Sequence, residues 1–405
     1  MAGKLNVKIK PIGLLDMIAF KNLVPNRVKK LEAGSLATLN SLPNVNKLAG
    51  ELHPKKQVFV IKEVIDEAPN VKTFKLVKKD GGKPATFRAG QYVSVRAKVG
   101  ESVLTRPYSL SSSPKEAQEG YYTITVKNSS KGFFSAYVME NWKEGEELET
   151  SAPEGSFYYE AIRDAKTVIG ICGGSGVTPF YSLAKAVADG AEDFNLIILY
   201  GSCKEGDILF KKQFAELEKV SKGKVKVVNV LSEERKECYE EGFITADLIK
   251  KYAPKAPYSI FICGPQIMYD FVSKEIKKLK LAPKFVRREL FGEIKMIDKA
   301  QGYPQDAFGK VFKLTVKSFD GEKVVDASSD ESVLVALERA GIAAPSKCRS
   351  GVCGYCRSKL LVGEVFIPED IEGRRAADIK FGYIHPCCSY PISDLSIELP
   401  PSQTL

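Results

Sequence analysis

The pattern of hydrophobic and polar residues changes along this chain of 405 residues, and each pattern predicts a different kind of fold. Between residues 57 and 160, short runs of strand-forming residues are separated by turn-rich stretches, which predicts antiparallel strands. The clearest runs cover residues 57–64, 71–77, 91–97 and 121–127. This spacing is typical of an antiparallel β-barrel or sandwich.

Between residues 161 and 292, continuous apolar runs alternate with amphipathic helical patterns. The apolar runs cover residues 167–172, 194–201, 225–231 and 258–264, and helices are expected at 179–189, 208–220 and 268–279. Short strands that are apolar on both faces and alternate with helices predict a parallel sheet with helices on both sides.

The two ends of the chain have patterns of their own. The polar stretch 293–309 is predicted to be a linker. Residues 310–405 follow it as a further domain, which begins with a hairpin around Asp320-Gly321 and continues with a helix at 332–341. Four prolines divide residues 1–56, so only short helices are expected there, for example at 14–23 and 27–36.

Composition and charge narrow the class of protein. With 44% hydrophobic and 27% charged residues, the chain is expected to be globular. We find no run of the roughly 18–20 apolar residues that a membrane-spanning helix needs, and no secretory signal pattern. We therefore expect a cytoplasmic protein. The net charge is +10, but residues 1–56 carry +7 and residues 308–405 carry −1. Because the excess lies in a basic extension, we expect no nucleic-acid partner.

The cysteines are the strongest sign of metal chemistry. The chain has nine, an odd number that argues against a disulfide framework in the absence of an export signal. Cys348, Cys353, Cys356 and Cys387 give the spacing C-x4-C-x2-C…C, which is typical of plant-type [2Fe–2S] sites. Zinc is the alternative, but its paired C-x2-C knuckles fit the four-residue gap poorly. Spacing alone does not separate Cys387 from its neighbour Cys388.

A family resemblance adds to this interpretation. Residues 310–400 resemble plant-type ferredoxins, whose last cluster ligand lies four residues before a proline. Pro391 then selects Cys387 as the fourth ligand. The resemblance implies a β-grasp ferredoxin domain that carries one electron at a time.

A second set of motifs lies in the predicted barrel and suggests a flavin site. One motif lies just after a strand, a dipeptide follows on a later strand, and a third motif opens a helical stretch with a glycine. These residues are Arg106, Pro107, Tyr108 and Ser109, then Val126 and Lys127, then Gly132, Phe133, Phe134 and Ser135. The exposed N–H groups at a helix N-terminus suit a pyrophosphate.

Together with the segment that follows, these motifs resemble the ferredoxin–NADP reductase superfamily over about residues 57–292. The resemblance implies that Arg106 pairs with the flavin phosphate, that Tyr108 packs on the isoalloxazine ring and that Ser109 lies near its reactive N5 atom. The G-x-x-S match at residues 132–135 favours FAD over FMN, although a related branch with the same domain order uses FMN.

A glycine-rich turn after the first strand of the predicted parallel sheet is a candidate nucleotide loop. Its residues are Gly173, Gly174, Ser175, Gly176, Val177, Thr178 and Pro179. Glycines at a strand-to-helix turn let a diphosphate approach the backbone, although the turn is not the G-x-G-x-x-G fingerprint. The turn resembles the nicotinamide-nucleotide loop of the same superfamily. Cys263, Gly264 and Pro265 resemble its second signature, which places the cysteine beside the nicotinamide ring.

The closing motif of the superfamily, near the flavin, is matched by residues 289–292, which include Glu289 and Phe291. The resemblance makes Ser109, Cys263 and Glu289 the candidate catalytic residues. The chain has only two histidines, and neither forms a recognisable acid–base pair.

The coenzyme is less firmly indicated. Residues 200–204, with Ser202, are compatible with NADH or NADPH. Glu233 and Glu234 stand where a basic residue would serve NADPH, and two carboxylates would repel its 2′-phosphate. The sequence therefore favours NADH and leaves NADPH possible.

The predicted domain order resembles phthalate dioxygenase reductase-type proteins. It implies that a hydride passes from NADH to flavin and that single electrons pass through the [2Fe–2S] cluster to a partner oxygenase or reductase. One alternative is a subunit of a stable redox complex, docked through residues 1–56, where any membrane contact would be peripheral. The other is a redox sensor or carrier.

Overall fold

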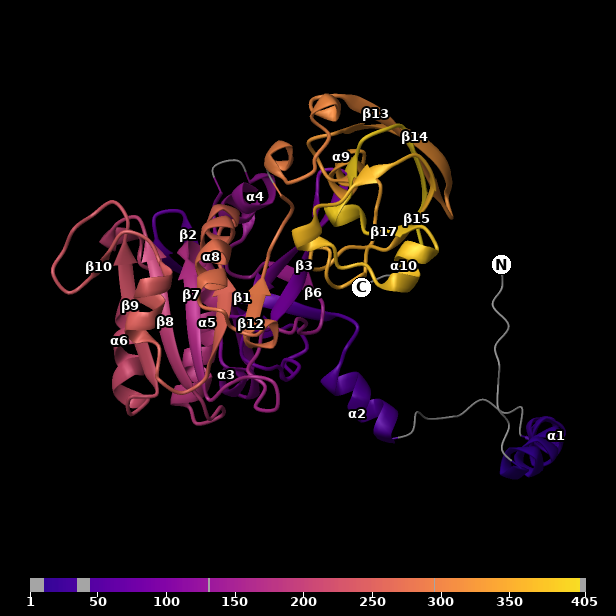
Figure 1. The fold of residues 1–405 in the computed structure, drawn as a ribbon, viewed down its shortest axis with the longest axis horizontal. Coiled ribbons are helices and arrows are strands. Elements are labelled where there is room, and N and C mark those ends of the chain that lie inside the picture. The colour runs from indigo at the N-terminus through magenta and orange to yellow at the C-terminus, as the bar shows by residue number, and fades with distance from the viewer. Residues whose placement is uncertain (1–10, 35–43, 130–131, 295, 401–405) are drawn as a thin grey trace. The chain divides into compact units, whose positions relative to one another are not determined.

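The structure is a computed structural model that describes residues 11–34, 44–129, 132–294 and 296–400 (Figure 1). The chain divides into two compact units after Ala49. Within the described residues, no helix combines the length and the apolar character needed to cross a lipid bilayer.

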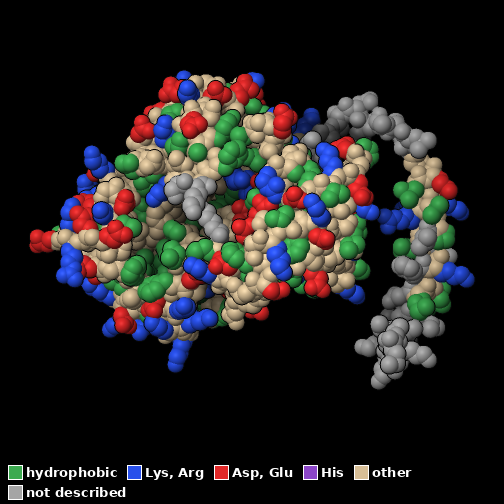
Figure 2. Space-filling view, turned by 90° about the horizontal axis from the view of Figure 1, so that it is seen from above, with side chains coloured by type: hydrophobic (Ala, Val, Ile, Leu, Met, Phe, Trp, Pro, Cys, Tyr) green, Lys and Arg blue, Asp and Glu red, His purple; other side chains and the backbone are tan. Residues whose placement is uncertain are grey.

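The first unit contains α1 (Pro11–Glu32), a single helix that continues through Pro25. The expectation of short helices at 14–23 and 27–36 is therefore wrong, with residues 35 and 36 outside the described part. A proline inside a helix removes one hydrogen bond and kinks the axis, but it does not have to end the helix. The helix α2 (Asn44–Leu52) crosses the division between the units. Hydrophobic side chains are exposed beside Lys and Arg on the N-terminal helices (Figure 2).

The second unit begins with an antiparallel sheet in the order β4-β3-β6-β1-β2-β5. Its elements are β1 (Gln57–Ala68), β2 (Val71–Lys78), β3 (Tyr92–Val99), β4 (Ser102–Ser109), α3 (Pro114–Gln118), β5 (Tyr121–Lys127), α4 (Phe133–Asn141) and β6 (Glu147–Thr150). A bridge between Leu110 and Ile124 joins the two edges of this sheet. The resulting barrel encloses an apolar core that includes Phe59, Phe74 and Tyr122.

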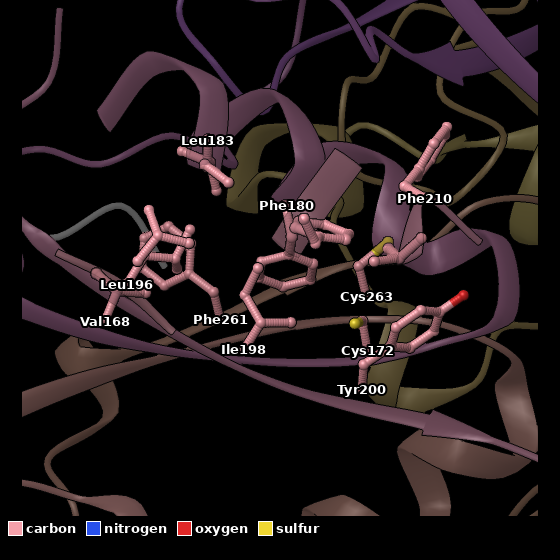
Figure 3. Close-up of a cluster of buried hydrophobic side chains, with 14 of the residues drawn as sticks. Val168, Cys172, Phe180, Leu183, Leu196, Ile198, Tyr200, Phe210, Phe261 and Cys263 are labelled. Atoms are coloured by element: carbon pink, nitrogen blue, oxygen red, sulfur yellow. The ribbon is translucent and has the colours of Figure 1, made fainter. Parts of the chain in front are cut away.

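A parallel sheet follows, in the order β10-β9-β8-β7-β11-β12. Its strands are β7 (Thr167–Gly173), β8 (Asn195–Ser202), β9 (Val225–Leu231), β10 (Glu240–Glu241), β11 (Tyr258–Cys263) and β12 (Val286–Glu289), and its helices are α5 (Thr178–Ala188), α6 (Lys211–Val220), α7 (Ala246–Tyr252) and α8 (Gln266–Lys278). Alternate residues of the central strands β7, β8 and β11 enter two apolar clusters on opposite faces: Val168 belongs to the cluster that includes Phe180 of α5, and Ile169 belongs to the cluster that includes Val272 of α8. Figure 3 shows the first cluster.

The last domain is a mixed sheet in the order β14-β13-β19-β15-β17 with α9 packed on it. Its elements are β13 (Val311–Ser318), β14 (Gly321–Ser328), α9 (Val333–Arg339), β15 (Ser358–Val362), β16 (Val365–Phe366), α10 (Ala376–Lys380), β17 (Tyr383–Ile384), β18 (Tyr390–Pro391) and β19 (Leu395–Glu398). The three predicted architectures, an antiparallel barrel, a parallel sheet and a β-grasp domain, are thus confirmed.

Candidate active site

The glycine-rich turn lies at the point where the parallel sheet reverses its strand order. β7 and β11 are neighbours in the sheet, and the strands that follow each of them extend to opposite sides. Ligands of such sheets bind in the crevice at the carboxyl ends of these two strands. Gly173 ends β7 and Cys263 ends β11, so both predicted nucleotide segments flank this crevice.

The turn after β7 and the end of β11 approach each other so closely that a side chain would not fit between them. A Cβ atom on Gly176 would lie 2.2 Å from the backbone oxygen of Cys263. Gly174–Val177 forms a short 3₁₀ turn, and α5 begins at Thr178 with Pro179 in its first turn. The cradle of backbone atoms and the helix N-terminus fit the diphosphate of a dinucleotide.

Cys263 and Glu289 are paired in register on the neighbouring strands β11 and β12. Both are buried, and one carboxyl oxygen of Glu289, Oε2, has no hydrogen-bond partner among the described atoms. Burial raises the pKa of the Glu289 carboxyl well above its usual range. Burial and the nearby Glu289 likewise raise the pKa of the Cys263 thiol. Burial therefore favours the uncharged forms of this adjacent carboxyl and thiol.

Tyr92 connects this pair to the barrel, and the sequence analysis did not identify it. It is paired with Ser109 across β3 and β4 and bridges to Glu154. Its ring and the Glu289 carboxyl oxygen Oε1 lie 2.9 and 3.4 Å from the position that a Cβ atom on Gly155 would take. Tyr92 is thus paired with Ser109 and lies near Glu289, which in turn is paired with Cys263. No motif marks this tyrosine, which has the local pattern of an ordinary strand residue.

The predicted flavin motifs also come together. The ring of Tyr108 stacks with Phe134 at a centroid distance of 6.5 Å, and the Arg106 guanidinium lies 5.5 Å from the Phe134 ring centroid. Gly132 precedes α4, and among the described residues it supplies no side-chain cap, so the N-terminus of this helix suits a phosphate. The Ser135 hydroxyl donates to Asn128 Oδ1 at 3.0 Å.

Other predicted flavin residues occupy different environments. Val126 packs in the barrel core, and Pro107 is also buried. Phe133 is exposed, and Phe291 packs edge-to-face against Tyr92 at 5.8 Å. Lys127 projects towards the nucleotide turn, because its Nζ lies 3.8 Å from the Cβ position of Gly174.

A cleft of about 410 Å³ lies beside this crevice, between the barrel and the loops that follow β8 and β9. Its lining includes Lys204, Glu205, Glu234 and Lys236, whereas Ser202 is buried at the end of β8. Hydrogen bonds from Lys211, Lys236 and Tyr239 lower the pKa of Glu205 to about 2. The backbone N–H of Glu205 lowers the pKa of Glu234. Both carboxylates are therefore ionised at every physiological pH.

The four predicted cluster ligands lie in one loop region of the β-grasp domain. The sulfur atoms of Cys356 and Cys387 are 3.5 Å apart. Backbone N–H groups of Gly351 and Cys353 donate to the sulfurs of Cys387 and Cys348 at 3.3 and 3.4 Å. The Cys388 thiol instead faces the carbonyl of His385 at 3.5 Å.

This donor set fits a [2Fe–2S] cluster, since N–H groups directed at thiolate sulfurs stabilise their charge. Across the ranges that the structure describes, no three His, Cys, Asp or Glu side chains are grouped to ligate one metal ion. A two-iron cluster differs from such a site because its thiolates are divided between two iron atoms.

The loop between α9 and β15 that carries Cys348, Cys353 and Cys356, called the cluster loop below, also contacts the barrel. Lys347 forms an ion pair with Glu154, and Arg349 and Arg106 both form ion pairs with Glu338 of α9. Arg106, which the resemblance assigns to the flavin phosphate, therefore also contacts the β-grasp domain. The sequence contained no signal for the partners Glu154 and Glu338.

Comparisons with known proteins agree with this arrangement. Residues 58–159 match the family of oxidoreductase FAD-binding domains, residues 171–274 the oxidoreductase NAD-binding domains, and residues 318–392 the 2Fe-2S iron-sulfur cluster binding domains.

Similar whole chains are also known. The glycine betaine monooxygenase reductase subunit of Chromohalobacter salexigens is 26% identical and covers 83% of this chain and 93% of its own length. The ferredoxin reductase component of 3-ketosteroid-9-alpha-monooxygenase from Rhodococcus rhodochrous is 28% identical and covers 77% and 88%, respectively. The solved structure of phthalate dioxygenase reductase shares the fold, with a TM-score of 0.61, 24% identity, and coverage of 85% of this chain and 98% of that chain.

These matches confirm the domain order predicted from the sequence. The chain is an NAD(P)H-dependent oxidoreductase that joins an oxidoreductase FAD-binding domain, an oxidoreductase NAD-binding domain and a C-terminal 2Fe-2S iron-sulfur cluster binding domain, in this order.

Proposed function

We propose that this protein is the reductase component of an oxygenase system. It takes a hydride from NADH to FAD and delivers single electrons through its [2Fe–2S] cluster to a partner oxygenase. The relatives support this proposal, because the reductase components of two monooxygenases are similar over most of this chain.

One structural observation carries the proposal. Tyr92 of the barrel strand β3 packs against Phe291, which follows β12 of the parallel sheet. Towards the β-grasp domain, Arg106 of β4 pairs with Glu338 of α9, and Glu154, which bridges to Tyr92, pairs with Lys347 of the cluster loop. A flavin held on these strands would lie between the electron donor and the electron acceptor. This placement avoids a diffusional step between the cofactors.

The chain's own residues bind and orient the cofactors and exclude water. When bound, the flavin supplies two-electron acceptance from a hydride and one-electron release, chemistry that belongs to the cofactor. Arg106 and the N-terminus of α4 are proposed to hold its phosphates. Cys263 and Glu289 are proposed to exclude water from the hydride-transfer region, where burial raises the pKa of the Glu289 carboxyl and favours its protonated form.

An anaerobic absorbance titration of the purified holoprotein tests this function. We expect NADH to bleach the flavin bands first and the broad iron–sulfur absorbance next, with a stoichiometry of three electrons per chain, two on the flavin and one on the cluster. NADPH is expected to do the same only at higher concentration. Bleaching of the flavin with persistent iron–sulfur absorbance would contradict the proposed electron path.

A matched pair of variants, compared with NADH and with NADPH, tests the coenzyme preference. Glu234→Gln removes one fixed negative charge beside the cleft but retains an acceptor for the N–H of Glu205. We expect it to improve kcat/KM for NADPH relative to NADH by about tenfold, because like-charge repulsion is removed. Glu237→Gln, on the same loop but outside the cleft lining, is expected to leave the ratio unchanged. Equal effects of the two variants would exclude a role for Glu234.

Residues 1–56 are proposed to dock the reductase in a larger redox complex in the cytoplasm, with any membrane contact peripheral and no nucleic-acid partner. Exposed apolar side chains on α1 and α2, such as Leu15, Ile18, Val45 and Leu48, favour a protein-docking role. Deletion of residues 1–50 is expected to abolish co-purification of the oxygenase component while NADH-driven cluster reduction stays unchanged. A partner retained by the truncated chain would refute the docking role.

A further inference from the structure

Glu338 forms ion pairs with two arginines from different domains. Its carboxylate accepts hydrogen bonds from Nη1 and Nη2 of Arg106 at 3.1 and 3.3 Å and from Nη1 and Nη2 of Arg349 at 2.5 and 3.1 Å. Its backbone carbonyl accepts a further bond from the Ser102 hydroxyl at 2.7 Å. Arg106 and Ser102 belong to β4, and Arg349 belongs to the cluster loop.

The charges in this network balance. Arg349 also pairs with Glu293, which follows β12, so two guanidinium groups meet two carboxylates. The Arg349 side chain is completely buried and that of Glu338 is 7% exposed. Removing one partner of such a buried pair leaves an uncompensated charge, which is strongly destabilising for the contact.

The network fixes the part of the cluster loop closest to the barrel. Cys348 lies between Lys347, which pairs with Glu154, and Arg349, which pairs with Glu338. Both neighbours of this predicted cluster ligand are therefore anchored. Arg349 adopts a left-handed backbone conformation with φ of 56°, which is rare for a residue with a long side chain. Its ion pairs compensate for that conformation.

The contact with Glu338 does not exclude a flavin phosphate from Arg106. A guanidinium has five N–H donors. Arg106 uses two on Glu338 and one on the carbonyl of Thr105, which leaves two for another ligand.

We propose that Glu338 is a positioning residue that sets the distance between the flavin-binding strand and the cluster loop by holding Arg106 and Arg349 at the same time. The inference rests on the electron path proposed above. Glu338 touches neither substrate nor cluster in this role and acts only through the two arginines.

Anaerobic stopped-flow mixing of the holoprotein with NADH tests the inference, because it separates flavin reduction from cluster reduction. For Glu338→Gln, we expect the rate of flavin reduction to stay within about twofold of the wild-type rate. The rate of cluster reduction is expected to fall by about ten- to hundredfold, because a small displacement caused by a distant substitution can have an effect of this size. The matched control is Glu331→Gln, which lies beside the same helix but pairs with Arg339 within the domain. It is expected to change neither phase.

Hydrogen–deuterium exchange gives a readout independent of turnover. Glu338→Gln is expected to increase exchange in residues 102–106 and 346–352 and to leave the parallel-sheet domain unchanged. If Glu338→Gln does not retain its cluster, Glu338→Asp keeps the charge on a shorter side chain and is expected to slow the cluster phase to a smaller extent.

Three results would overturn the inference: an unchanged cluster phase in both Glu338 variants, equal slowing of the flavin and cluster phases, or equal slowing in Glu331→Gln. Failure of the wild-type protein to pass electrons from NADH to the cluster would instead overturn the proposed function, so the two failures are distinguishable.

Discussion

The Cys387→Ser variant is expected to lose its [2Fe–2S] cluster and at least about 99% of its NADH-driven reduction of a one-electron acceptor such as cytochrome c, because the internal electron path is interrupted. The Cys387 sulfur is 3.5 Å from that of Cys356 and accepts the N–H of Gly351 at 3.3 Å. A serine hydroxyl is a poor substitute for a thiolate ligand to iron. Iron and sulfide content, with the visible spectrum, measure the loss directly.

The neighbouring thiol supplies the control. Cys388→Ser changes a side chain that faces the His385 carbonyl, and it is expected to keep the cluster and most of the activity. Flavin reduction by NADH should persist in both variants, because the barrel and the parallel sheet do not depend on the cluster ligands. Loss of the cluster in Cys388→Ser with retention in Cys387→Ser would reverse the ligand assignment.

The Gly176→Ala variant is expected to lose about two orders of magnitude in the rate of flavin reduction by NADH. The added Cβ would lie 2.2 Å from the backbone oxygen of Cys263, so the turn or the end of β11 must move. A displacement of this size at a hydride-transfer site disturbs the reacting geometry. Transient kinetics at saturating NADH measure the effect, while chemical reduction by dithionite should still reach flavin and cluster.

Gly206→Ala is the matched control for this substitution. Gly206 lines the neighbouring cleft and has nothing within 4 Å of its Cβ position, so alanine is accommodated. Its rate of flavin reduction is expected to match that of the wild type. Thermal unfolding of both variants separates a local defect from general destabilisation, since overpacking typically costs about 1–3 kcal/mol. A Gly176→Ala enzyme that is reduced at the normal rate would show that the turn does not position the nucleotide.

The parts of the site that sequence reasoning could predict are those built from local patterns. The C-x4-C-x2-C spacing encodes one tight loop, and the turn after β7 is a local strand-to-helix connection. By contrast, Tyr92, Glu154 and Glu338 acquire their roles only when separate domains meet. A tyrosine in a strand or a glutamate on a helix has the same local signature in any other protein, so no pattern marks these three.

The fold was predictable for a related reason, and the prediction failed at an informative place. Burial of alternate or continuous apolar residues leaves a periodic trace in the sequence, which identified the barrel and the parallel sheet. α1 left no such trace, because many of its side chains are exposed, and its prediction rested on the prolines of residues 1–56, of which Pro25 lies inside the helix. A single proline tells where a helix is strained but not whether it ends.

The ion pair between Glu293 and Arg349 has a consequence for how the modules of such reductases can be exchanged. Glu293 is the first residue of the predicted linker, residues 293–309, where two genes could otherwise be joined without consequence for the fold. A chimera whose junction falls after Glu293 would combine a carboxylate from one parent with an arginine from the other. We therefore expect that a junction placed before Glu293 transfers the ferredoxin domain together with the ion pair that aligns it.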